Sequence, residues 1–167
     1  MEDASPPYAA KAFANLVLDW ADGVGVPITP LKLQKMLYFI HADYLCRFGE
    51  PLINEEFEAW AYGPVVPSVY AQFKEFSRQA ITKRASTFDP ISRSSAVLSA
   101  RPGQVIRSRI KPIFDLYIDV DAGLLSALSH KHGGPWERAT QRFEAHRNIN
   151  RVISNELIVT AHNLAPS

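Results

Sequence analysis

The chain has 167 residues, a formal net charge of +1 at pH 7 and one cysteine, Cys46. This length suits one domain spanning residues 1–167, and a single cysteine excludes an internal disulfide, so we expect a cytoplasmic protein. Residues 1–7 are acidic and proline-bearing and the apolar stretches are interrupted by charges, so we expect neither a signal peptide nor a span of roughly 20 apolar residues crossing a membrane.

Two helices are predicted at the start of the chain. Apolar residues recur at helical spacing over residues 8–22. Thr29 followed by proline is a good helix start, because the hydroxyl caps the first turn and a proline there removes no needed donor. The second helix is expected to run over residues 30–48 and to end at Gly49, which adopts the left-handed conformation easily.

The next part of the chain has shorter elements. Residues 51–62 lack helical spacing and are predicted to form a loop with room for a short strand or hairpin. Prolines make residues 62–67 rigid, and a third helix is expected over residues 67–79. Residues 80–103 are rich in Ser, Thr, Arg and Pro and are predicted to be an exposed basic loop or variable segment.

Helical spacing returns in the last third of the chain. A helix is predicted over residues 105–117, in which Pro112 either bends one helix or begins another. Further helices are expected after Asp121, from Pro135, and over residues 152–161. The pattern predicts a mainly α, compact single-domain fold of about six or seven helices, with a short strand or hairpin as an addition.

Catalytic and cofactor signatures are weak. The glycines at 23 and 25 follow a helix and lack the third glycine of a dinucleotide-binding loop. His130 and His132 form an H-x-H pair, yet the remaining histidines and Cys46 show no metal-ligand spacing. No G-x-S-x-G pattern is present. We therefore expect no catalytic residue, no metal and no cofactor; a metal-dependent enzyme using the two histidines is the alternative.

Aromatic residues in a proline-fixed backbone are the most distinctive feature. Aromatic side chains on a backbone that is already rigid lose less conformational entropy when they bind a partner. Such a segment therefore suits a preorganised binding surface. Packing in the core is the competing interpretation, because large aromatics are usually buried. The residues expected to form or brace a partner-binding surface are Trp60, Tyr62, Gly63, Pro64, Val65, Tyr70, His130 and Trp136.

The charge is unevenly distributed. Residues 74–111 contain nine Lys or Arg residues against two acidic residues. Such a stretch can steer an acidic protein partner, or it can bind nucleic acid, which makes a nucleic-acid-binding regulator the alternative function. A solvated variable connection explains the same composition.

Three strings in this order resemble the Panacea antitoxin domain family: LKLQKMLYF at residues 31–39, EAWAYGPVVPSVY at residues 58–70 and LSHKHGGPW at residues 128–136. The resemblance implies a mainly helical antitoxin of a toxin–antitoxin pair that neutralises a cognate toxin protein by direct binding. For the way in which the toxin is neutralised, the resemblance leaves open blocking of the toxin, an adaptor mode in which the antitoxin delivers the toxin to the ClpXP protease through the ClpX unfoldase, or both. The eight residues named above lie within these strings.

Overall fold

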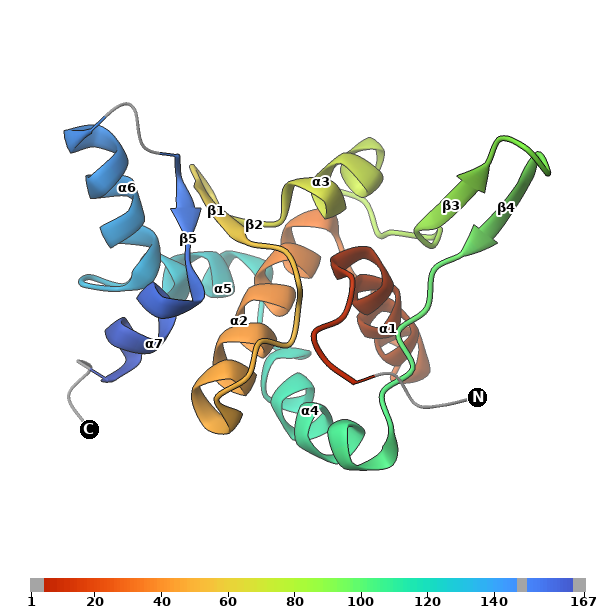
Figure 1. Ribbon diagram of the computed structural model, residues 1–167, viewed down its shortest axis with the longest axis horizontal. Coiled ribbons are helices and arrows are strands. Elements are labelled where there is room, and N and C mark those ends of the chain that lie inside the picture. The colour runs from red at the N-terminus through yellow and green to blue at the C-terminus, as the bar shows by residue number, and fades with distance from the viewer. Residues whose placement is uncertain (1–4, 147–149, 164–167) are drawn as a thin grey trace.

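In the computed structural model, seven α-helices, one 3-10 helix and two small antiparallel sheets make up the described part of the chain, residues 5–146 and 150–163 (Figure 1). The mainly α prediction is confirmed in this part. The elements, in chain order, are α1 (Ala10–Gly23), α2 (Pro30–Phe48), β1 (Phe57–Trp60), β2 (Gly63–Val65), α3 (Pro67–Phe73), η1 (Lys74–Phe76), β3 (Ser86–Asp89), β4 (Ser94–Val97), α4 (Gln104–Tyr117), α5 (Ala122–Ser129), α6 (Pro135–Ala145), β5 (Val152–Ile153) and α7 (Asn155–Asn163).

Helix α2 is the central element and has the predicted boundaries. The Thr29 hydroxyl accepts from the backbone N–H of Lys32 at 3.3 Å, and Gly49 has a φ of 72°. These local features start and stop the helix as residue type predicts. Helices α1, α3, α4, α5 and α7 all pack against α2, which lies in the middle of the molecule (Figure 1).

The first sheet joins distant parts of the chain in the order β2-β1-β5. Strands β1 and β2 pair as a hairpin, with Trp60 opposite Gly63, while Phe57 of β1 pairs with Ile153 of β5. The prediction that residues 152 and 153 begin the last helix is therefore wrong, and that helix begins at Asn155. The cause is tertiary, because a two-residue strand exists only where its partner edge is available.

The second sheet is a hairpin of β3 and β4 that projects from the helices (Figure 1). It falls inside the segment predicted as an exposed loop. The strands escaped the sequence pattern because their side chains are almost all exposed, so no apolar alternation marks a buried face. Helix α3 is also shorter than predicted: it ends at Phe73, and η1 continues the helical turn only to Phe76, whereas the sequence predicts a helix to residue 79.

Helices α4 and α5 agree with what Pro112 and Asp121 indicate in the sequence. Pro112 lies inside α4 and does not begin a new helix. The Asp121 carboxylate caps α5 by accepting from Gly123 N at 2.8 Å and Leu124 N at 3.2 Å. One hydrophobic cluster collects buried residues from α1 through α7. Among the described residues, no helix combines the length and apolar character that crossing a bilayer requires.

Candidate functional site

The β1–β2 hairpin is where the three motif segments meet. Gly63 at the start of β2 has a φ of 104°, which side chains rarely allow. A Cβ there would lie 2.5 Å from Ser129 Oγ and 2.8 Å from Lys35 Cε. Both the conformation and the space therefore require glycine, because α2 and α5 approach the hairpin backbone closely.

Helix α2 holds one side of the hairpin through two buried polar side chains. The Lys35 ammonium donates to Pro64 O at 2.8 Å. The Gln34 amide accepts from Val66 N at 2.9 Å and donates to Val66 O at 3.4 Å. Desolvation by burial lowers the pKa of Lys35 to about 7.

Lys35 and Gln34 were not among the predicted site residues. Both lie in the string LKLQKMLYF, so the motif contained them, but helical spacing treated polar residues as interruptions of an apolar face. A polar residue flanked on both sides by buried positions of one helix is the signal that could have identified them.

The segment from α5 to α6 holds the turn between β1 and β2 through three successive carbonyl oxygens. Trp136 Nε1 donates to Trp60 O at 2.7 Å, and Ser126 Oγ donates to Tyr62 O at 2.9 Å. Between them, Nε2 of His130 lies 3.1 Å from the carbonyl oxygen of the intervening Ala61. One distant part of the chain thereby contacts the turn at each of these three residues.

His130 and Trp136 act together in this contact. Their rings pack with centroids 3.9 Å apart, and His130 Nδ1 lies 2.6 Å from Ser126 O. Both side chains are half-buried. They therefore brace the hairpin turn rather than project from it.

The eight predicted residues divide by exposure. Gly63, Pro64 and Val65 are buried, so core packing is the correct interpretation for them. Tyr62 and Tyr70 are 76% and 42% exposed. The half-buried Trp60 packs its ring against Tyr70 with centroids 4.9 Å apart.

We call Trp60, Tyr62 and Tyr70 the aromatic surface. Trp60 Nε1 donates to Glu58 Oε2 at 2.7 Å, which fixes the indole. Within the described residues, the hydroxyls of Tyr62 and Tyr70 have no hydrogen-bond partner. Two exposed phenols beside a braced indole form an amphipathic surface on a rigid backbone, the kind of group that serves as an anchor in protein interfaces.

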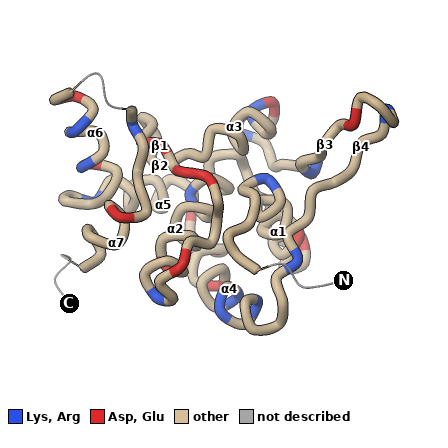
Figure 2. Tube along the Cα trace, viewed as in Figure 1, with Lys and Arg blue, Asp and Glu red and all other residues tan. Residues whose placement is uncertain are grey.

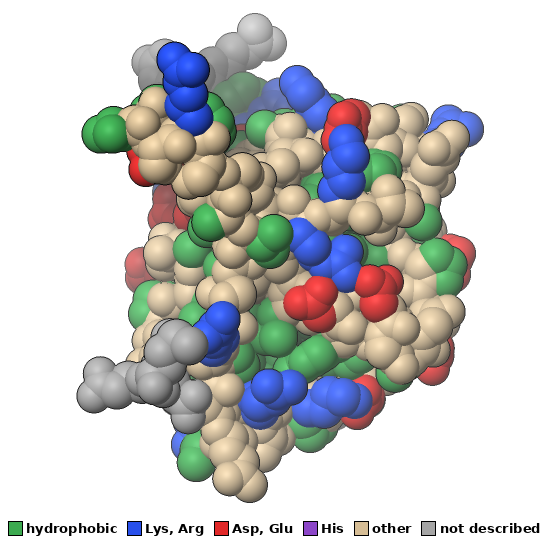
Figure 3. All heavy atoms as spheres, turned by 90° about the vertical axis from the view of Figure 1, so that its right-hand side faces the viewer, with side chains coloured by type: hydrophobic (Ala, Val, Ile, Leu, Met, Phe, Trp, Pro, Cys, Tyr) green, Lys and Arg blue, Asp and Glu red, His purple; other side chains and the backbone are tan. Residues whose placement is uncertain are grey.

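The basic stretch 74–111 is spread over η1, the β3–β4 hairpin and α4 (Figure 2). At least four of its nine cations form ion pairs within the described residues: Lys83 with Glu75, Arg84 with Asp19 and Asp22, Arg109 with Glu50, and Lys111 with Asp115. Figure 3 shows basic and acidic side chains interleaved on the face nearest this stretch. Much of the charge excess seen in sequence is thus compensated by acidic residues, most of them from elsewhere in the chain.

His130 and His132, the H-x-H pair of the sequence, contact different groups. His132 Nδ1 lies 3.2 Å from Glu137 Oε1, while His130 faces carbonyl oxygens. In residues 5–146 and 150–163, no group of three or more His, Cys, Asp and Glu side chains is placed to hold a metal ion. The turn at Gly23 and Gly25 connects α1 to α2.

Comparison with known proteins identifies the class to which this fold and site belong. Residues 33–137 match the family described as antitoxin SocA-like, Panacea domain. The chain belongs to this family of SocA-like antitoxins.

One relative is antitoxin SocA of Caulobacter vibrioides (strain NA1000 / CB15N), to which this chain is 41% identical over 128 residues. The alignment covers 77% of this chain and 68% of the relative. No solved structure matches the chain.

Proposed function

We propose that this protein is the antitoxin of a toxin–antitoxin pair and that it binds a cognate toxin protein through the aromatic surface. Membership of the SocA-like family supports the antitoxin role. The observation that carries the choice of surface is the bracing of the hairpin: three successive carbonyl oxygens, of residues 60–62, face side chains of the segment from α5 to α6, while Tyr62 stays 76% exposed. A backbone ordered before binding loses little entropy when its aromatic side chains enter a partner.

The proposal gives each part of the hairpin a separate role. Tyr62 and Tyr70 contact the toxin, whereas Gly63, Pro64 and Val65 keep the backbone in place from within the core. His130 and Trp136 hold the turn from the other side. No catalytic step, metal or cofactor is assigned to any of them.

The test is co-expression of the tagged protein with the product of the adjacent gene, followed by affinity measurement on the purified pair. Tyr62→Ala should weaken binding by about 2 kcal/mol, roughly 30-fold, with an unchanged melting temperature, because its side chain has few contacts within the fold. Tyr70→Ala should act in the same direction.

Val105→Ala is the matched control, since Val105 is exposed on α4, outside the aromatic surface. It should leave both affinity and melting temperature unchanged. Toxin binding that survives the double change of Tyr62 and Tyr70 to alanine would remove the aromatic surface from the proposal. An adjacent gene product that does not bind the unaltered protein would contradict the antitoxin role itself.

We further propose that the protein acts in the cytoplasm as an adaptor that presents its toxin to ClpXP. The measurement is the lifetime of the toxin in cells with and without ClpX and with and without this protein. A lifetime that shortens only when both are present supports delivery. A toxin that stays bound and long-lived in the presence of both proteins would mean neutralisation by occlusion.

A nucleic-acid-binding role makes a different prediction. Binding driven by counterion release falls steeply with salt, about a thousandfold or more between 50 and 200 mM for a protein making 6–10 phosphate contacts. The ion pairs of Lys83, Arg84, Arg109 and Lys111 leave at most five of the nine basic residues of the stretch for such contacts, fewer than the six to ten assumed above. We therefore expect no salt-steep DNA binding, as measured by fluorescence anisotropy at these two salt concentrations.

A further inference from the structure

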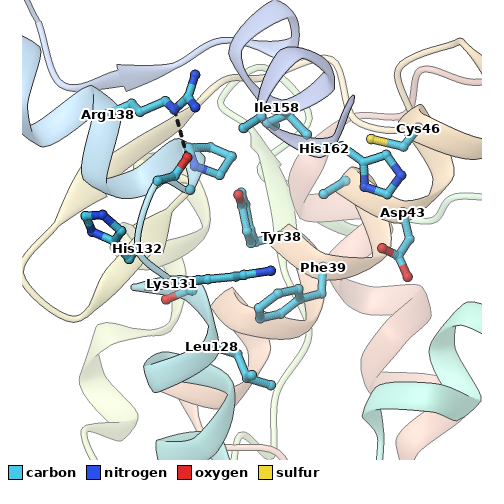
Figure 4. A pocket seen from close by; sticks show the side chains of 16 residues that line it. Tyr38, Phe39, Asp43, Cys46, Leu128, Lys131, His132, Arg138, Ile158 and His162 are labelled. Carbon is cyan, nitrogen blue, oxygen red and sulfur yellow. Dashed lines mark hydrogen bonds between the residues drawn. The ribbon is translucent and has the colours of Figure 1, made fainter. Parts of the chain in front are cut away.

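A pocket of about 300 Å³ lies between α2, the loop from α5 to α6, and α7 (Figure 4). It is separate from the aromatic surface, and the function proposed above makes no use of it. Its volume is at the lower end of the range for small-molecule sites and suits a group the size of one side chain. The apolar part of its wall comes from Phe39, Ala42, Leu128, Ile158 and Ala161.

The hydroxyl of Tyr38 is directed into this pocket (Figure 4). Tyr38 is only 4% exposed, and its ring packs against Phe39 and Phe57. No described residue forms a hydrogen bond with the hydroxyl. Its oxygen is not one of the fully enclosed polar atoms without a partner, of which the described residues show only Thr140 Oγ1, so the hydroxyl is open to the pocket and can donate to a bound group. Burial also raises the pKa of Tyr38, so the hydroxyl keeps its proton and remains a donor.

A cation faces the same space. Lys131 extends across the pocket toward Phe39 (Figure 4) and forms no ion pair with any described residue. Arg138, at the opposite wall, donates through Nε to Gly133 O at 2.7 Å, which leaves the ends of its guanidinium open.

The acidic group of the pocket, Asp43, is engaged through one of its two carboxylate oxygens, Oδ2. Asp43 accepts from the Tyr117 hydroxyl at 2.8 Å and lies 3.6 Å from Arg47. His132 at the rim faces Glu137, and His162 lies near Asp43 and Cys46 (Figure 4). The two cationic side chains at the pocket, Lys131 and Arg138, therefore outnumber its one carboxylate, and together with the Tyr38 hydroxyl they are its free donors.

We propose that this pocket binds a carboxylate carried on a single apolar group of side-chain size. The Lys131 ammonium and the Tyr38 hydroxyl donate to the carboxylate, and the apolar group packs on Phe39, Ala42 and Ile158. A charge-assisted hydrogen bond is about twice as strong as one between neutral groups, which gives selectivity for the acid over the amide. The carboxylate is either the end of a polypeptide chain with an apolar last residue or a free small acid.

The probe is N-acetyl-L-phenylalanine, titrated into the purified full chain and followed by NMR chemical shifts. N-acetyl-L-phenylalaninamide, which has the same apolar group without the charge, is the matched ligand. The acid should bind saturably with a Kd on the order of millimolar, as expected for so small a ligand, and at least about tenfold more tightly than the amide.

Three variants test the two donors. Lys131→Met and Tyr38→Phe should each weaken binding of the acid about tenfold. Lys74→Met removes an exposed lysine outside the pocket and should leave binding unchanged. Tyr38→Phe should keep the melting temperature, because the lost hydroxyl has no partner among the described residues, so a loss of binding will not reflect unfolding.

Two further ligands distinguish a polypeptide chain end from a free small acid as the source of the carboxylate. A tetrapeptide ending in phenylalanine that binds at least as tightly as the acetylated residue would assign the pocket to chain ends. Phenylacetate that binds while the tetrapeptide is excluded would assign it to free acids. Equal binding of acid and amide, no saturable binding of any acid, or full affinity in Lys131→Met and Tyr38→Phe would each overturn the proposal. None of these measurements uses the toxin, so this proposal and the antitoxin role fail independently.

Discussion

Lys35 is the residue whose chemistry depends most on its surroundings. Its side chain is fully buried, and it donates to Pro64 O in the backbone of the hairpin. The amine is one of the groups that hold β2 against α2, yet burial lowers its pKa to about 7. Its protonation state therefore affects the stability of the segment that carries the aromatic surface.

Lys35 should make stability rise with pH. Because the pKa is about 7 in the folded state and 10.5 in the unfolded state, the unfolded chain binds more protons between these values, and the free energy of unfolding increases as pH rises through this window. The difference between the unaltered protein and Lys35→Met should grow by about 2 kcal/mol between about pH 7 and pH 9. Urea unfolding at several pH values measures it, and a difference that stays constant with pH would contradict a lowered pKa.

Gly63 offers a second test at the scale of one residue. Gly63→Ala should destabilise the protein by about 2 kcal/mol or more, because a Cβ adds a clash with Ser129 and Lys35 to an unfavourable φ. Gly25→Ala is the control: Gly25 has a φ of 72°, but a Cβ added there would meet no atom within 4 Å, so only the backbone term of about 1 kcal/mol applies. Equal losses in urea unfolding would show that space at Gly63 is not limiting.

At the scale of elements, the β3–β4 hairpin depends on one side chain of α1. Asn15 is buried and donates to Ala85 O at 2.9 Å and to Leu98 O at 2.7 Å, while its carbonyl accepts from Ala85 N at 2.8 Å. A two-stranded hairpin alone is marginally stable in water, so its orientation depends on this attachment at its base. The exposed Phe88 and Ile91 lie beyond the attachment and add no packing against the body.

Asn15→Ala should loosen the hairpin. Three hydrogen bonds are lost and buried backbone groups at 85 and 98 are left without these partners, which should cost about 1–3 kcal/mol. Hydrogen–deuterium exchange should accelerate over residues 85–98 while α2 keeps its protection. Asn54→Ala, which changes an exposed asparagine in the loop before β1, is the control. Uniformly faster exchange across the whole chain would instead mean that Asn15 supports the global fold.

At the scale of the whole molecule, His41 connects three parts of the chain. From the middle of α2, its Nδ1 accepts from Ile53 N at 3.2 Å, and its Nε2 donates to Asn155 Oδ1 at 2.8 Å, at the start of α7. This pattern requires the neutral ring, and burial lowers the pKa of His41. The attachment of α7, and with it one wall of the pocket, thus depends on an uncharged histidine.

Acidification should therefore destabilise the protein through His41. Because the folded-state pKa lies below the unfolded value of about 6.5, the unfolded chain binds the proton first, and stability falls as pH decreases through about 6.5. In His41→Gln this loss should be smaller, as measured by melting temperature between about pH 7.5 and 5. An identical loss in the variant would show that other groups carry the acid sensitivity.

The sequence by itself determined some of the helix ends, because these depend on interactions between neighbouring residues. Thr29, Pro30 and Gly49 predict the ends of α2, and Asp121 predicts the start of α5, because caps and turns depend on a few neighbouring residues. The motif strings likewise identified the family and the region of the hairpin.

Only the tertiary structure decided which residues of that region are buried. Gly63 and Tyr62 are adjacent, yet Gly63 lies against Lys35 and Ser129 while Tyr62 projects outward, because α2 and α5 cover one side of the turn. The same reason explains β5, which needs the edge of β1, and the roles of Lys35 and His41, whose partners are 29 and 114 positions away. Burial and pairing with distant residues arise from the packing of the whole chain, and a local pattern cannot contain them.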